Sequence, residues 1–150
     1  MAADLVIRTA QPDDFGPITR LLERLGRPTV TPRNRAAVKD VFNEQLTDPS
    51  TSHLVAVTGR DRVIGFCSLH FRTRLNHDRP QAWIPDVIVD EGERGRGVAR
   101  ALLGEAERRA RDRGCTDVVL ESSYTRKEDH LLYVGAGMTD TGKFFRKRVD

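Results

Sequence analysis

The sequence predicts a mixed α+β domain in which helices flank a largely antiparallel sheet. Apolar residues recur at helical spacing in the N-terminal third, alternate with period two in the middle, and return to helical spacing over residues 98–113. Of the 150 residues, 38% are hydrophobic and 31% are charged, a balance typical of a folded, soluble domain. The chain is the usual length of one domain, so we expect a single domain over residues 1–150.

The N-terminal third is predicted to hold one strand and two helices. Residues 5–8 are β-prone and end at a turn-like proline and aspartate. Residues 13–25 carry apolar side chains at helical spacing behind an aspartate, Asp13 or Asp14, that can cap the helix. Gly26 and a following proline end it, and a second helix runs over residues 31–46.

The middle of the chain is predicted to form strands. Residues 53–57 and 62–71 make a hairpin around the turn at residues 58–61. After a polar loop, residues 82–89 form a third strand. Pro85 within that strand cannot donate to a neighbour, which implies an edge position, a bulge or a local splay.

The C-terminal third begins with a charged, glycine-bearing loop. The loop leads into residues 98–113, the clearest amphipathic helix, which Gly114 ends. We predict a strand over residues 117–121, a short helical turn over residues 130–134 and a last strand over residues 143–149.

Composition and charge narrow the classes of function. No apolar run approaches the ~20 residues that span a bilayer, and the N-terminus lacks the features of a signal peptide. Two cysteines far apart in sequence, Cys67 and Cys115, favour a reduced, cytoplasmic protein. The net charge of +3 suits a polyanionic small molecule as well as nucleic acid. We find no nucleic-acid-binding module, so neither nucleic acid nor a membrane is an expected partner.

The most informative stretch is the loop Arg94-Gly95-Arg96-Gly97-Val98-Ala99, which joins an apolar strand to a helix. The first N–H groups of a helix lack internal acceptors and carry the positive end of its dipole. The two glycines let the backbone approach an anion closely, and the arginines add positive charge. The loop therefore suits a diphosphate. It lacks the P-loop lysine and the three-glycine dinucleotide spacing, so a simple tight turn is the alternative.

Three ordered segments resemble the GNAT superfamily of N-acetyltransferases. Arg94, Gly97 and Ala99 match the family loop of Gln or Arg, two residues, Gly, one residue, then Gly or Ala. Residues 84–89 match the splayed fourth strand, and residues 130–138 are similar to the segment with His, Tyr and Gly-Phe. The resemblance covers nearly the whole chain. It implies a GNAT-like mixed, largely antiparallel sheet that is splayed at the fourth strand and flanked by helices.

The resemblance also implies acetyl-coenzyme A as co-substrate, with no metal. In the family, the loop N–H groups hold the pyrophosphate, and the fourth strand's backbone binds the pantetheine arm. The residues thereby predicted to contact the coenzyme are Val87, Ile88, Val89, Arg94, Gly95, Arg96, Gly97, Val98, Ala99, Arg100, His130 and Tyr133.

The reaction implied is direct attack of a neutral amine on the acetyl thioester, which needs a base and an acid. Tyr133 occupies the family position of the acid that protonates the thiolate. By residue type alone a core aromatic is the preferred interpretation, and the resemblance favours the acid instead. The glutamate frequent on the family's fourth strand is absent, because Trp83 and Pro85 stand there. The resemblance leaves the base open between Asp86 and Glu121, acting directly or through a water molecule.

The histidines carry a weaker signal. His130 could titrate near neutrality, but its position in the resemblance suggests a structural role beside the coenzyme. His53, His70 and His77 are isolated in sequence and are expected to be ordinary strand or surface residues. Their spacing supports no metal site.

The C-terminal segment is similar to that of family members that acetylate aminoglycosides, aminoalkylphosphonates and amino acids. We therefore predict a small primary amine as acceptor. Two alternatives stay open: a protein or peptide N-acetyltransferase, and a non-catalytic acyl-coenzyme A-binding sensor. The absent strand glutamate favours the sensor, whereas Tyr133 argues against it. The resemblance also allows a homodimer.

Overall fold

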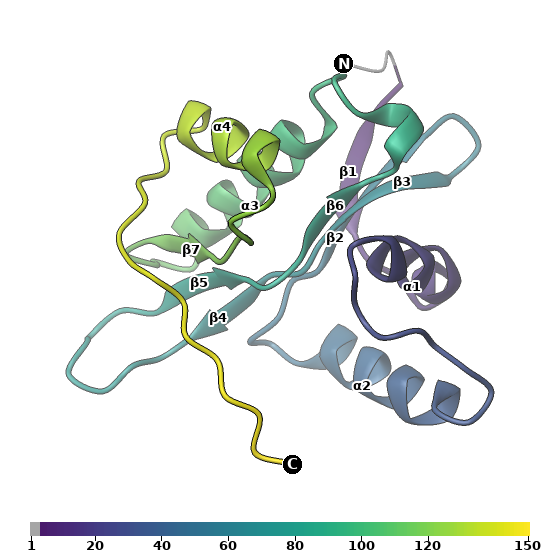
Figure 1. Cartoon of the computed structure of the whole chain (residues 1–150), viewed down its shortest axis with the longest axis horizontal. Coiled ribbons are helices and arrows are strands. Elements are labelled where there is room, and N and C mark those ends of the chain that lie inside the picture. The colour runs from purple at the N-terminus through teal and green to yellow at the C-terminus, as the bar shows by residue number, and fades with distance from the viewer. Residues whose placement is uncertain (1–3) are drawn as a thin grey trace. The chain divides into compact units, whose positions relative to one another are not determined.

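The computed structural model describes residues 4–150 (Figure 1). The chain divides into two compact units, Met1–Leu120 and Glu121–Asp150. The single domain expected over residues 1–150 stays a prediction. No helix within the described residues is long and apolar enough to cross a membrane.

The first unit contains all the strands among the described residues and three of their α-helices. In chain order these are β1 (Val6–Thr9), α1 (Phe15–Arg24), α2 (Arg35–Thr47), β2 (Leu54–Thr58), β3 (Arg62–Cys67), β4 (His70–Arg72), β5 (Gln81–Ile84), β6 (Val87–Val89), α3 (Val98–Asp112) and β7 (Val118–Leu120). Two short 3₁₀ turns precede α1 and α3, at Pro12–Asp14 and Glu91–Glu93. The second unit contains α4 (Lys127–Gly135).

The strands form two sheets, and the chain passes directly from one sheet to the other twice, from β3 into β4 and from β5 into β6. One sheet has the order β1-β2-β3-β6 and is antiparallel throughout. The other has the order β4-β5-β7, in which β5 and β7 run parallel. The predicted strands 62–71 and 82–89 are therefore each divided, into β3 with β4 and β5 with β6. The mixed, largely antiparallel fold is confirmed.

An extra residue on one strand explains the division. Phe66 pairs with Ile88 and His70 pairs with Trp83, so four steps along one strand oppose five along the other. The extra residue falls around Pro85, which cannot donate to a ladder. The bulge and splay that the sequence predicts at Pro85 are thus confirmed.

Helices cover both faces of the four-stranded sheet, with α1 and α2 on one side and α3 on the other (Figure 1). The α1–α2 side packs a buried cluster that includes Phe15, Phe42 and Phe66. On the α3 side, β3 approaches the helix closely at Gly65. A Cβ atom there would lie 3.1 Å from Leu102 Cδ1, closer than most real Cβ contacts, so a larger residue would require the helix side chains to shift.

The sequence predicts that Asp13 or Asp14 caps α1, and the structure shows that neither does. No side chain caps α1 among the described residues. The Asp14 carboxylate instead accepts the Gln11 N–H at 2.7 Å and both Arg8 guanidinium nitrogens, at 2.7 and 3.0 Å. An arginine fork binds a carboxylate in two places, which holds Asp14 toward β1 rather than over the helix.

Three helices end in the same motif, with glycine in the left-handed region. These glycines are Gly26, Gly114 and Gly137, with φ of 98°, 72° and 89°. In each case the next residue donates its N–H to a carbonyl five positions back, at about 3.0 Å. The motif after α1 sets the direction in which Arg27 leaves the helix.

The predicted C-terminal strand is wrong. Residues 139–150 form no regular element in the structure, and Phe144 and Phe145 are exposed. Adjacent side chains on a strand point to opposite faces, so the two phenylalanines could not share one buried face. The predicted turn over residues 130–134 is real, and it extends to the full helix α4.

Two glycine-to-alanine changes, one within α3 and one just after it, should have opposite effects. Gly104 is exposed inside the helix, and a Cβ added there would have no neighbour within 4 Å, so Gly104→Ala should raise the free energy of unfolding by about 0.5–1 kcal/mol. Gly114→Ala should lower it by about 1 kcal/mol, because an alanine is strained at positive φ. Urea denaturation of both variants checks this, and a stabilising Gly114→Ala would contradict the motif.

Candidate active site

The loop between β6 and α3 presents an open helix N-terminus. Gly95 and Gly97 have φ of 76° and 79°, a conformation that other residues rarely adopt. The first hydrogen bond within the helix runs from the Ala101 N–H to the Gly97 carbonyl, at 3.0 Å. The N–H groups of residues 98–100 therefore come before the first acceptor that the helix itself supplies. No side chain caps α3 among the described residues. The local geometry therefore suits an anion.

Ion pairs hold the beginning of this loop. Arg24, at the end of α1, binds the Asp90 carboxylate at 3.0 Å. Arg62 on β3 binds both Asp90 and Glu93, at 3.3 and 3.2 Å, and Arg96 binds Glu93 at 3.3 Å. Exposed pairs of this kind stabilise a protein by at most about 1 kcal/mol each. Their larger effect is to balance two carboxylates that would otherwise repel an anion at α3.

The outer edge of β6 is open. The Ser68 N–H donates to the Asp86 carbonyl at 2.9 Å, and the Asp90 N–H donates to the Ile64 carbonyl at 2.7 Å. Because antiparallel bonds recur every second residue, the residues between them, Val87 and Val89, direct their backbone groups away from β3. No strand of the described chain lies on that side, since β7 pairs with β5 instead.

Ile88 differs from its two neighbours. The same alternation turns its backbone toward β3, and its side chain is buried in the cluster beneath α1 and α2. Of the three β6 residues predicted to contact a coenzyme, Val87 and Val89 therefore offer backbone groups at the open edge, and Ile88 does not.

Asp86 lies where the sheet divides, and its polar atoms are engaged. Its N–H donates to the Ser68 hydroxyl oxygen at 2.8 Å, and that hydroxyl lies 3.2 Å from Asp86 Oδ2. Arg27 Nε donates to Oδ1 at 2.6 Å, and Arg27 Nη2 donates to the Pro85 carbonyl at 3.1 Å. One serine and one arginine thus satisfy the groups that the bulge removes from the ladder.

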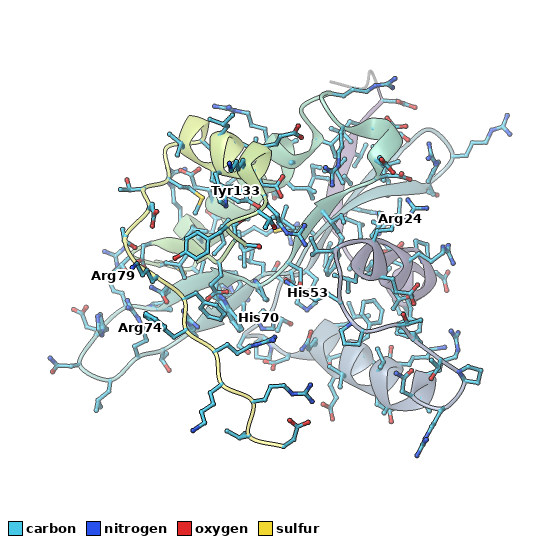
Figure 2. All side chains as sticks on the ribbon, in the orientation of Figure 1. Arg24, His53, His70, Arg74, Arg79 and Tyr133 are labelled. Carbon is cyan, nitrogen blue, oxygen red and sulfur yellow. The ribbon has the colours of Figure 1, made fainter. Side chains whose placement is uncertain are left out.

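Two histidines join this junction, His53 just before β2 and His70 at the start of β4. The ring centroids of His53 and His70 are 5.2 Å apart (Figure 2). The His70 ring lies 5.4 Å from that of Trp83. His53 is buried, and His70 is half-buried. Burial, with a smaller effect from His70, lowers the pKa of His53 to about 4. Burial likewise lowers the pKa of His70, against the opposing charge of Asp86.

The remaining predicted site residues lie in the C-terminal unit. Glu121 is exposed in an irregular segment, and no strand includes it. His130 and Tyr133 lie on α4 and are half-buried, and His130 Nε2 is 2.8 Å from the Ser123 carbonyl oxygen. That bond ties α4 to the segment before it. The Tyr133 carbonyl accepts the Met138 N–H at 3.0 Å in the motif that ends the helix.

Within the first unit, the structure gathers Asp86 with two histidines that the sequence treats as isolated. Period-two alternation from Phe66 places Ser68 and His70 on one face, a signal that was readable in the sequence. The proximity of His53 was not readable, because it depends on the pairing of β2 with β3. The described residues contain no group of three potential metal ligands.

Comparison with known proteins agrees with this geometry. The Acetyltransferase (GNAT) family model matches residues 18–137, which is most of the chain. The chain belongs to the GNAT family of acetyltransferases. The matched span includes the loop before α3, strands β2 to β7 and α4. The strand, loop and helix described above are thus the elements of a GNAT acetyltransferase domain.

This GNAT domain is similar to several curated proteins. It is 33% identical to N-acetyltransferase 8B of Rattus norvegicus over 106 residues, and this alignment covers 71% of this chain and 47% of that protein. It is 29% identical over 113 residues to the aminoalkylphosphonate N-acetyltransferase of Salmonella typhimurium, covering 75% of this chain and 73% of that protein. The chain thus spans about half the length of the first relative.

Solved structures share the GNAT fold over almost the whole chain. A putative acetyltransferase from Agrobacterium tumefaciens has a TM-score of 0.83 at 25% identity, covering 96% of this chain and 99% of that one. Glucosamine-6-phosphate N-acetyltransferase from Arabidopsis thaliana has a TM-score of 0.82 at 21% identity, covering 97% and 99%.

The buried His53 should make stability depend on pH. Because its folded pKa is about 4 and its ordinary value is 6.5, the unfolded chain binds a proton that the folded chain does not. The free energy of unfolding should therefore fall as pH drops from 6.5 to about 4, by about 3 kcal/mol from this group. Above pH 6.5 the contribution is constant.

Urea denaturation across this pH range tests the effect. His53→Gln should flatten the dependence, and His77→Gln, which changes an exposed loop histidine, should leave it as in the parent. Equal slopes for parent and His53→Gln would show that His53 is not held neutral by the fold.

Proposed function

We propose that the protein transfers an acetyl group from acetyl-coenzyme A to the primary amine of a small molecule, by direct attack of the amine. The observation that carries this proposal is the continuity of the open β6 edge with the uncapped N-terminus of α3. An unpaired strand edge and a helix N-terminus in one line suit a ligand with an amide-bearing arm and a diphosphate.

In this proposal each part of the coenzyme has its own protein groups. The N–H groups of Val98 and Ala99 hold the pyrophosphate, and the exposed arginines of the loop add positive charge around it. The backbone of Val87 and Val89 binds the arm. An arm that runs along β6 away from α3 ends beside Asp86, which places the thioester at the division of the sheet.

Asp86 serves better as a positioning group than as the base. Arg27 and Ser68 already occupy both of its carboxylate oxygens, and abstraction of a proton would require one of them to leave. Glu121, the other candidate of the sequence, is exposed. Tyr133 stays the proposed acid for the departing thiolate, as the resemblance implies.

A small amine is the proposed acceptor. The support is the aminoalkylphosphonate N-acetyltransferase of Salmonella typhimurium, which this chain matches over 73% of that protein's length. The proposed setting is the cytoplasm, because Cys67 and Cys115 are free and buried. A homodimer stays a prediction.

Calorimetric titration with acetyl-coenzyme A tests the coenzyme site. The parent should bind, and Gly97→Val and Ala99→Leu should each weaken binding at least about tenfold, or about 1.4 kcal/mol. Ala99→Leu introduces a large side chain into the first turn without changing the glycines, so it keeps the backbone of the loop. Gly92→Ala is the matched control, because Gly92 is exposed, has ordinary φ and no neighbour within 4 Å of a Cβ.

Absence of binding by the folded parent would contradict the proposed function. If Ala99→Leu bound acetyl-coenzyme A as tightly as the parent, the coenzyme would not bind at the N-terminus of α3. Circular dichroism of each variant separates a lost site from a lost fold.

A panel of amines then tests the acceptor. With acetyl-coenzyme A, 2-aminoethylphosphonate or an aminoglycoside should be acetylated with a higher kcat/KM than a lysine-bearing peptide. The reverse order would favour a protein acceptor. Binding of acetyl-coenzyme A without acetylation of any amine would favour a sensor domain and overturn the enzymatic proposal.

A further inference from the structure

His70 is the partly exposed member of the histidine pair at the division of the sheet. It is the first residue of β4, directly across from Trp83 on β5. Its ring lies between those of His53 and Trp83, at centroid distances of 5.2 and 5.4 Å. Figure 2 shows His53 and His70 together in the central part of the first unit.

The two histidines differ in their contacts. His53 Nδ1 accepts the Leu69 N–H at 3.1 Å, so the His53 proton lies on Nε2, which is 2.6 Å from Gln45 Oε1. Both ring nitrogens of His53 are therefore occupied. The ring of His70, by contrast, packs against the rings of His53 and Trp83.

His70 lies near the point where the proposed thioester ends. The coenzyme arm along β6 would reach Asp86, and Asp86 faces Ser68 across the division. His70 follows Ser68 by two residues, on the same face and about 7 Å further along the strand direction. An amine that attacks a thioester at Asp86 would thus meet an imidazole on the side of α1 and α2.

Burial keeps this imidazole neutral at neutral pH. Burial is the main cause that lowers the pKa of His70 below its ordinary value of 6.5. Asp86 and Asp48 oppose this effect, and Arg72 on β4 reinforces it. The neighbouring His53 is itself neutral and adds no charge. A base must be unprotonated to act, and His70 meets this condition.

We propose that His70 is the general base that accepts the proton of the acceptor's ammonium group. This role rests on the proposed function. His70 takes one proton, and the neutral amine attacks the thioester carbon, forming the C–N bond as the C–S bond breaks. A second amine proton ends on the departing sulfur, the third stays on the amide nitrogen, and the imidazolium returns its proton to water.

Asp86 complements this role without supplying the base. Its carboxylate acts on the charge of His70, and a negative group beside an imidazolium stabilises it when the proton arrives. Arg27 and Ser68 keep the carboxylate in place. His70 thus takes the place of the strand carboxylate whose position here is held by Trp83 and Pro85.

The test compares His70→Gln with the control His77→Gln. Acetylation of 2-aminoethylphosphonate and of an aminoglycoside is measured as a function of pH, alongside calorimetric titration with acetyl-coenzyme A. His70→Gln should lower kcat about 100-fold or more, with small changes in KM and in the Kd of acetyl-coenzyme A. The parent's kcat should rise with pH to a plateau through an apparent pKa below 6.5. His70→Gln should lose this acidic limb, and His77→Gln should keep it.

Other results overturn the proposal. A His70→Gln variant that keeps the parent's kcat or its acidic limb would show that His70 accepts no proton in the reaction. A loss of acetyl-coenzyme A binding in His70→Gln would assign His70 to the coenzyme instead. A parent that binds acetyl-coenzyme A but acetylates neither these two amines nor a lysine-bearing peptide would overturn the enzymatic function together with this role.

Discussion

The contact between Ser68 and Asp86 holds the bulge on which the functional architecture depends. An extra residue near Pro85 breaks the register of two adjacent strands, and Ser68 satisfies the N–H that the break leaves unpaired. The break lets β7 pair with β5 while β6 keeps a free edge. The open edge, the helix N-terminus and the histidine junction all follow from this one displacement of the chain.

The two faces of the four-stranded sheet pack against different helices and position different residues. On one face, Gly65 leaves room for Leu102 and Val98 of α3 to pack closely against β3. On the other face, α1 and its terminal glycine direct Arg27 to Asp86. The end of α1 reaches both regions, because Arg24 binds Asp90 in the loop before α3 and Arg27 binds Asp86.

Burial determines the chemistry available at the junction. An imidazole removed from water is held neutral, because the imidazolium loses more free energy of hydration than it gains by attraction to nearby carboxylates. His53 is neutral and fully hydrogen-bonded, which makes it a rigid partner for the ring of His70. Trp83 and Pro85 stand where the resemblance would place a strand glutamate, and the charges of Arg27 and Asp86 balance each other beside Pro85.

The sequence by itself determined the loop, the helix after it and the bulge, because these depend on local rules. Glycines at Gly95 and Gly97, proline at Pro85 and the periodicity of α3 act within a few residues of their own positions. The same local rules failed at residues 143–149, where β-prone residues lacked one common face. Tertiary structure alone decided that His53 lies beside His70 and that Arg27 occupies Asp86. Those contacts join residues far apart in the chain, and only strand register and helix packing bring them together.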